Sequence, residues 1–169
     1  EGFAFVPYSS YVEFDVPGVI DMSRVDSTSD INITAPGEYY IESAVVNSLS
    51  LAEGVILHGR SDLYGDDDAT VLTIQGGNLR LGDGAELAVK SVYLGNPVPP
   101  ANVAANVQTV IAVRGGRTAT ISSDIVGSAA LMKTGLGTLI LSGDNEFSGA
   151  FQIQEGVVRA QSGTAFGAP

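Results

Sequence analysis

The densest group of side chains that could bind a metal is a run of aspartates in the middle of the chain. Asp66, Asp67 and Asp68 are consecutive, Asp62 lies shortly before them, and Asp83 follows further along. Carboxylate oxygens are the ligands that Ca²⁺ selects. Their spacing matches neither an EF-hand loop nor the glycine-rich nonapeptide of calcium-binding β-rolls. Two interpretations therefore stay open: a calcium site formed by Asp62 and Asp66–Asp68, or an exposed, solvated loop.

The sequence offers few residues that could support nucleophilic catalysis. His58 is the sole histidine, so a Ser-His-Asp triad could form only around it, and no G-x-S-x-G motif accompanies it. Because His58 directly follows the apolar run Val55–Leu57, we predict a solvent-facing residue at the end of a strand. No catalytic residue and no organic cofactor are expected.

Composition and charge exclude several classes of protein. The chain has 169 residues, enough for one domain, and no cysteine, which removes disulfide scaffolds, thiolate zinc sites and cysteine nucleophiles. Its formal charge of −11 would repel phosphate backbones, so nucleic-acid binding is not expected. No apolar run approaches the roughly 18 residues that span a bilayer. Because the sequence opens on Glu1 without an initiator methionine, a larger parent protein is expected.

The apolar pattern predicts an all-β fold of stacked turns. Short apolar runs recur between glycine, asparagine, aspartate and serine residues, and no sustained helical stripe appears. Comparable runs are separated by 23, 23 and 19 residues, at Leu49 and Leu72, Leu87 and Val110, and Leu139 and Val158. About 20 residues suffice for one rung of a β-solenoid. Alternation then predicts that leucines point inward while the intervening residues point outward, namely Ser50, Thr73, Arg80 and Ile140.

Two segments differ from this pattern. Residues 1–40 hold seven of the twelve Phe and Tyr residues, so we predict an atypical aromatic-rich cap over the first rung, or a segment that pairs with another copy of the chain. Within it, residues 31–34 and 36–41 are expected to form two strands around a tight turn. Residues 41–169 are assigned to the solenoid, with residues 96–106 as a protruding loop.

The most specific motif begins at Leu131. It is written LMKTGLGTLILSGDNEFSG over residues 131–149, with a tail that runs to Gly167. This stretch, residues 131–167, resembles the passenger-associated transport repeat, also called the autotransporter-associated β-strand repeat. Glu146 and Ala150-Phe151 depart from the usual pattern. The glycines suit corners, Leu139 and Leu141 suit an interior, and Asn145 can bond corner amides.

The resemblance implies a right-handed parallel β-helix in a secreted protein of the bacterial cell surface. Three functions stay open: a structural stalk or display module, which we favour; an adhesin for glycans or a cell-surface partner, with Tyr64 and Tyr93 as candidate contacts; and a polysaccharide lyase. Head-to-tail self-association into fibres is a further hypothesis, because solenoid ends carry strand edges. A lyase would use arginines beside aspartates, and the chain offers Arg60, Arg80, Arg114 and Arg117 beside Asp62 and Asp83. Exposed cross-rung ion pairs, worth less than about 1 kcal/mol each, are the simpler interpretation of those arginines.

Overall fold

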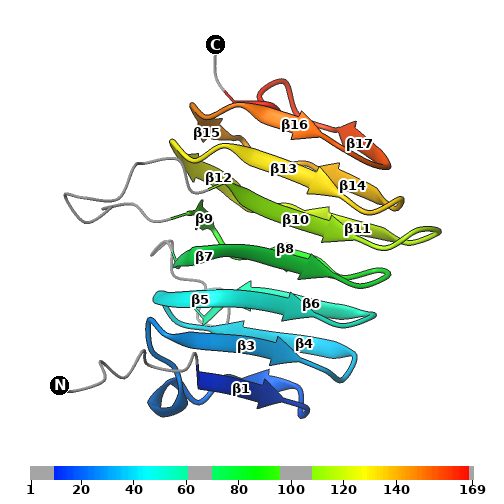
Figure 1. Ribbon diagram of the computed structural model, residues 1–169. Helices are drawn as coiled ribbons and strands as arrows, with labels where there is room; N and C mark the ends of the chain where they lie inside the picture. The colour runs from blue at the N-terminus through cyan, green and yellow to red at the C-terminus, as the bar shows by residue number, and fades with distance from the viewer. Residues whose placement is uncertain (1–9, 61–69, 96–107, 168–169) are drawn as a thin grey trace, which may run out of the picture.

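The computed structural model describes residues 10–60, 70–95 and 108–167. Within them every strand pairing is parallel, and the one helical element is the short 3-10 turn η1 (Met22–Arg24). In Figure 1 the strands of the longer sheet run in front, and those of the second sheet return behind them while the chain climbs from N- to C-terminus. The fold is the expected right-handed parallel β-helix.

The β-helix has three sides. The first side is built from the strands β1 (Ser10–Phe14), β3 (Ser29–Ile33), the C-terminal halves of β5 (Ala44–Leu51) and β7 (Val71–Leu81), β10 (Thr109–Val113), β13 (Leu131–Thr134) and β16 (Phe151–Ile153). The second side contains β2 (Gly18–Val19), β4 (Gly37–Ile41), β6 (Val55–Gly59), β8 (Glu86–Ala88), β11 (Thr118–Ile121), β14 (Thr138–Leu141) and β17 (Val157–Ala160). The third side contains the N-terminal halves of β5 and β7, then β9 (Ser91–Leu94), β12 (Asp124–Gly127) and β15 (Glu146–Phe147). The described residues therefore form seven rungs.

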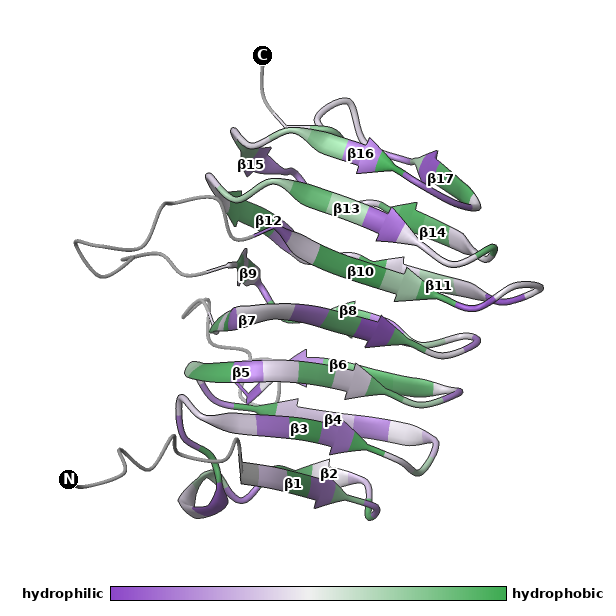
Figure 2. Cartoon of the chain, viewed as in Figure 1, coloured by the Kyte–Doolittle hydropathy of each residue, from purple (hydrophilic) through white to green (hydrophobic). Residues whose placement is uncertain are grey.

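Alternation along each strand builds a continuous apolar interior. On the first side the inward positions pair rung by rung, in the order Val12, Ile31, Leu49, Leu79, Ile111, Lys133 and Ile153. The five apolar residues that precede Lys133 are all buried, and they join a single core cluster with the second and third sides. Each fully buried Leu or Ile contributes about 1.5–3 kcal/mol, so the core is what holds the rungs together. Figure 2 shows the hydropathy alternating along the strands.

The predicted repeat is right in period and partly wrong in register. Leu139 pairs with Val158, as expected. Leu49, however, pairs with Leu79 instead of Leu72, and Leu87 pairs with Ile121 instead of Val110. The reason is uneven rung length: the pairings 49–79 and 79–111 span 30 and 32 residues and include residues 61–69 and 96–107, whereas 133–153 spans 20. Residues that are equally spaced in the sequence therefore lie on different sides of the β-helix.

The N-terminal part belongs to the same stack from Ser10 onward. The two strands expected at residues 31–34 and 36–41 are present as β3 and β4, and β1 already pairs in register with β3. Parallel stacking is therefore present from β1 onward. Residues 1–9, the loop expected at residues 96–106 and the candidate Tyr64 lie outside the described residues.

One of the four predicted outward positions is buried. Ser50, Arg80 and Ile140 occupy outward positions, but Thr73 is only 6% exposed. Thr73 lies on the third side in register between Val45 and Tyr93. Those two larger neighbours flank the threonine, so an outward position on this side is nevertheless covered.

Candidate functional site

The outer face of the first side carries two rows of polar side chains over its early rungs. One row follows the pairings of Tyr11, Asp30, Ser48 and Asn78. The parallel row follows Glu13, Asn32, Ser50, Arg80 and Ala112. Successive members are about 4.8 Å apart, the spacing of hydrogen-bonded strands. The fold thereby turns residues far apart in sequence into a regular polar surface.

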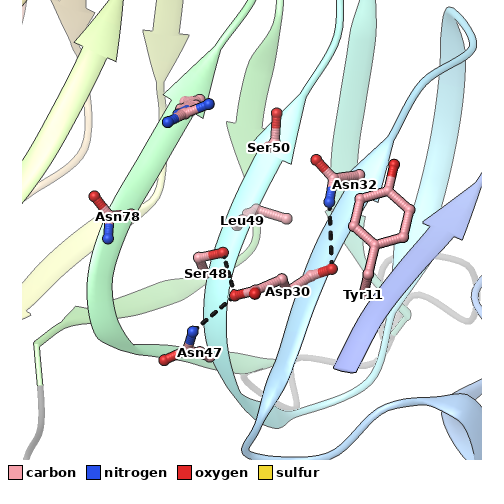
Figure 3. A pocket seen from close by; sticks show the side chains of 9 residues that line it. Tyr11, Asp30, Asn32, Asn47, Ser48, Leu49, Ser50 and Asn78 are labelled. Atoms are coloured by element: carbon pink, nitrogen blue, oxygen red, sulfur yellow. Dashed lines mark hydrogen bonds between the residues drawn. The ribbon is translucent and has the colours of Figure 1, made fainter. Parts of the chain in front are cut away.

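A shallow hollow of about 360 Å³ lies on this face (Figure 3). Its lining consists of Tyr11, Asp30, Asn32, Asn47, Ser48, Leu49, Ser50, Asn78 and Arg80. A second hollow of about 500 Å³ shares Ser50 and Arg80 with the first. The rest of its lining is Leu51, Leu81, Gly82, Ala112 and Arg114. We call the two hollows together the polar groove.

Asp30 organises the first hollow. One of its carboxylate oxygens accepts hydrogen bonds from Asn47 Nδ2 at 2.7 Å and from Ser48 Oγ at 2.6 Å. Its carbonyl oxygen accepts a bond of 3.3 Å from Asn32 Nδ2. Figure 3 shows these side chains converging on Asp30. The network fixes the amide and hydroxyl groups in defined orientations, as a preorganised binding surface requires.

Tyr11 stands at one end of the groove. Its side chain is 64% exposed, and its hydroxyl donates to Glu13 Oε2 at 3.0 Å. This hydrogen bond, followed by desolvation and the negative charge of Glu13, raises the pKa of Tyr11 above its ordinary value. The phenol therefore stays protonated at neutral pH and presents an aromatic face beside polar groups.

Arg80 and Arg114 stand at the other end of the groove. Both are exposed, and neither forms an ion pair with any described residue. The carboxylates of the neighbouring corners are already engaged: Asp83 and Glu53 lie 3.2 and 3.7 Å from Arg117. The groove is thus acidic near Glu13 and Asp30 and basic near its two arginines.

The cross-rung ion pairs expected of the arginines exist for two of the four. Arg117 bridges to Asp83 and Glu53, and Arg60 pairs with Glu42. Asp83 also accepts a 2.9 Å bond from the backbone N–H of Thr118. That bond, opposed in part by desolvation and aided by Arg117, lowers the pKa of Asp83. Asp83 is therefore a corner-stabilising carboxylate.

The residues of the calcium hypothesis, Asp62 and Asp66–Asp68, lie outside the described residues. Across residues 10–60, 70–95 and 108–167, no cluster of three or more His, Asp or Glu residues could hold a metal ion. No helix of this described part is long and apolar enough to cross a membrane.

His58 occupies a half-buried outward position on β6. Its ring stacks on that of Tyr40 at 5.2 Å between centroids and 19° between planes, and the two residues are in register on adjacent strands. The expected position near the strand end is confirmed, although Tyr40 covers part of the ring.

A buried lysine was not expected from the patterns in the sequence. Lys133 occupies an inward position of β13 and is completely buried. Its Nζ donates to the carbonyl oxygens of Thr134, Gly135 and Glu155 at 2.7, 2.6 and 3.2 Å. Burial lowers the pKa of Lys133, an effect that the charge of Glu155 partly opposes. The signal that could have revealed it is a lysine in the inward column of an otherwise apolar strand series.

Asn145 joins three consecutive rungs. Its Oδ1 accepts from the N–H of Ile125 and its Nδ2 donates to the carbonyl of Ala165, both at 2.8 Å. Each partner is 20 residues away, which is the local rung length. The corner-bonding role predicted for Asn145 is confirmed.

The comparisons with known proteins agree with this architecture. Residues 131–160, which form β13 to β17, match the family model of the Passenger-associated-transport-repeat. A stretch of 50 residues is 44% identical to "Adhesin BmaC autotransporter" of Brucella suis biovar 1 (strain 1330), and covers 30% of this chain but 2% of that protein. No solved structure matches the chain. Residues 131–160 of the β-helix therefore match a passenger-associated transport repeat, and the two matches indicate a secreted, cell-surface protein.

Proposed function

We propose that this chain is a non-catalytic β-helical segment that separates and displays surfaces of a secreted passenger. The observation that carries the proposal is the unbroken strand register from Val12 to Ile153 across all seven rungs. The first five residues of this column lie in one apolar core cluster. Each rung contacts its neighbours, so length can be added by adding rungs. Six steps of about 4.8 Å give a rod of about 29 Å between the first and last rungs.

The transport repeat supports the same role at the level of single rungs. Lys133 ties the corner of one rung to Glu155 of the next, and Asn145 links the rungs on either side of it. These bonds satisfy backbone groups inside the rod, where unpaired ones would cost about 1–3 kcal/mol each. A stalk needs these hydrogen-bonded corners, because local unfolding of one rung would expose unpaired strand edges.

The experiment that tests the display role uses insertions matched to the rung. Duplication of residues 131–150 adds one complete rung, whereas duplication of residues 131–140 adds half of one. With the chain exported in a passenger that bears an epitope tag, we expect the first variant to keep surface display and protease resistance and the second to lose them. Equal outcomes for the two variants would contradict a role that depends on rung-by-rung stacking.

A catalytic role is tested directly on the purified chain. Acidic polysaccharide is incubated with the protein in the presence and absence of a chelator, and new unsaturated chain ends are measured. We expect no turnover above the buffer control under either condition. Chelator-sensitive cleavage would replace the display proposal by the lyase alternative.

Adhesion is the second candidate function. The polar groove favours it, because preoriented amides, hydroxyls and arginines beside an exposed tyrosine suit recognition of a polar ligand. The similarity to a protein named as an adhesin also supports it. A rod that displays a binding groove combines both roles, and a panel of immobilised glycans probed with the purified chain tests it.

Self-association is proposed for the isolated chain. The last rung leaves Ile153, Val157 and Phe166 about half exposed, and β16 and β17 are each terminal in the order of their sheets. A second copy stacking its first rung on these residues would continue both sheets head to tail. Sedimentation velocity across a wide concentration range, with negative-stain microscopy, should show growing linear oligomers; a constant monomer would refute the proposal.

A further inference from the structure

We propose that the polar groove binds an acidic oligosaccharide, whose carboxylate or sulfate group is held between Arg80 and Arg114. This inference rests on the adhesion candidate, for which it names the ligand class, and it does not depend on the display role. The juxtaposition that carries it is two exposed arginines without an ion pair to any described residue, lining one hollow in a chain of net charge −11.

The two arginines are free for a ligand because nearby acids are engaged elsewhere. Arg117 holds both Asp83 and Glu53 at the corner next to Arg114. The outward neighbours of Arg80 on adjacent strands are Ser50 and Ala112, which carry no charge. Guanidinium groups present planar pairs of N–H donors that match a carboxylate or sulfate. An anionic group therefore complements the positive charge at this end of the groove.

The rest of the groove fits sugar hydroxyls. From Arg80 the hollow continues along outward rows that contain Ser50, Asn32 and Ser48, and it ends at Tyr11. Amide and hydroxyl groups repeat here at about 4.8 Å, and they can donate to and accept from successive sugar units. The exposed ring of Tyr11 offers a flat apolar face with a polar edge.

The charge distribution also orients the ligand. Asp30 and Glu13 lie toward Tyr11, where they would accept hydrogen bonds from neutral hydroxyls and repel an anion. The acidic group of the sugar therefore lies at the Arg80 end, and the neutral units extend toward Tyr11.

A peptide ligand fits this surface less well. Bound peptides usually extend an open sheet edge or insert apolar anchors into a groove. The strands beneath the groove, β3, β5 and β7, already pair on both sides. The hollow beside Tyr11 is lined mainly by polar side chains. We therefore favour a saccharide, and an acidic peptide enters the test as a competing outcome.

The test titrates the intact chain by isothermal calorimetry with four probes: oligogalacturonate, its methyl ester, a sulfated heparin-derived oligosaccharide and oligoglutamate. We expect binding of at least one acidic oligosaccharide and at least tenfold weaker binding of the methyl ester. The two acidic sugars distinguish carboxylate from sulfate. Binding to neither of them, equal binding of the methyl ester, or tighter binding of oligoglutamate would overturn the proposal.

The site is located with charge-matched variants. Arg80→Gln and Arg114→Gln should each weaken binding of the acidic sugar by about 10- to 100-fold, the usual worth of a charge-assisted hydrogen bond. Arg159→Gln makes the same charge change on β17, on another side of the β-helix, and should leave affinity within twofold. Circular dichroism checks that all three variants fold. Unchanged affinity in both groove variants, or an equal loss in Arg159→Gln, would refute the assignment.

Discussion

Two buried polar side chains, Lys133 and Asn145, have hydrogen-bond partners that single rungs cannot provide. Lys133 donates to three carbonyl oxygens, one of them on the following rung. Asn145 serves one donor and one acceptor on opposite neighbouring rungs. Buried polar groups are stable only when paired, so each residue couples the formation of its own rung to that of its neighbours.

Replacement of Lys133 by Met should lower the free energy of unfolding by about 1–3 kcal/mol at pH 7, because carbonyl oxygens lose a buried donor. The matched control is Lys90→Met, since Lys90 is an exposed partner of Asp124 and should cost less than about 1 kcal/mol. Urea unfolding followed by circular dichroism measures both. A smaller loss for Lys133→Met than for Lys90→Met would contradict the buried hydrogen-bonded role.

The Lys133→Met variant should also change how the free energy of unfolding depends on pH. Burial lowers the pKa of Lys133 from 10.5, so the unfolded chain binds this proton more readily than the folded chain. The wild type therefore gains stability from this group as the pH rises through its folded pKa toward 10.5, and the Met variant does not. The difference between the two proteins should be larger at pH 10 than at pH 7.

Removal of the Asn145 side chain leaves a buried N–H of Ile125 and a buried carbonyl of Ala165 without partners. We expect Asn145→Ala to cost about 2–4 kcal/mol in thermal or urea unfolding. Asn78→Ala, at an exposed position, should stay within about 0.5 kcal/mol of wild type. Equal effects of the two substitutions would show that Asn145 does not bridge the rungs.

At the scale of elements, the corners need glycine for two distinct reasons. Gly135 has φ +74°, a conformation that side chains disfavour. Gly143 has no such φ, but a Cβ there would lie within 3.0 Å of the backbone of Ser122 and Ser123 on the previous rung. Close approach of neighbouring corners is therefore a constraint separate from backbone conformation.

Gly143→Ala should destabilise the chain by about 1–3 kcal/mol, because the added methyl group must push two rungs apart. Gly163→Ala is the matched control: its Cβ would meet nothing within 4 Å, and its φ is not positive. That control should be neutral or slightly stabilising. Differential scanning calorimetry measures the thermal stability of both variants. An equal loss of stability in the two would contradict the close contact between corners.

The corners also contribute to the loss of stability in acid. Asp26 accepts bonds from Thr28 and Ser29 in the turn before β3, and these bonds lower its pKa. Because the folded pKa lies below the unfolded value, the stabilisation is present above about pH 4 and is lost as the pH falls through the folded pKa. Asp26→Asn should therefore flatten the fall in stability below about pH 4, measured by urea unfolding at a series of pH values.

Asp15→Asn provides the control for Asp26, since Asp15 accepts no hydrogen bond from a described residue. An identical acid profile for both variants would mean that the bonds to Thr28 and Ser29 do not set the pH dependence.

At the scale of the whole molecule, the sequence determines the class of fold better than its register. The alternation of Leu49-Ser50-Leu51 and the 20-residue repeat after Leu131 are local patterns, and they correctly predicted parallel stacked rungs. The pairing of Leu49 with Leu79 could not be predicted, because their separation of 30 residues departs from the period of about 20 that most other rungs show. Local periodicity shows that strands exist, whereas long-range pairing decides which strands meet.

The polar groove illustrates the same limit for the candidate site. Tyr11, Asn32 and Arg80 are ordinary outward residues in sequence, and only the rung register brings them onto one face. The ion pair of Arg117 likewise depends on the register, because its partner Asp83 lies 34 residues earlier in the sequence. That Arg80 and Arg114 form no ion pair with a described residue depends on the whole corner and could not be predicted from spacing.

The rungs stack in register, so distance along the molecule grows by about 4.8 Å for each pairing step. The chain has no cysteine, so spin labels can be attached at cysteines introduced in one outward row, at Tyr11 with Gln152 and at Tyr11 with Val110. These pairs are six and four pairing steps apart. Double electron-electron resonance should therefore give separations of about 29 and 19 Å, apart from the common length of the label. Equal separations, or a shorter distance for the Tyr11–Gln152 pair, would contradict the stacked β-helix.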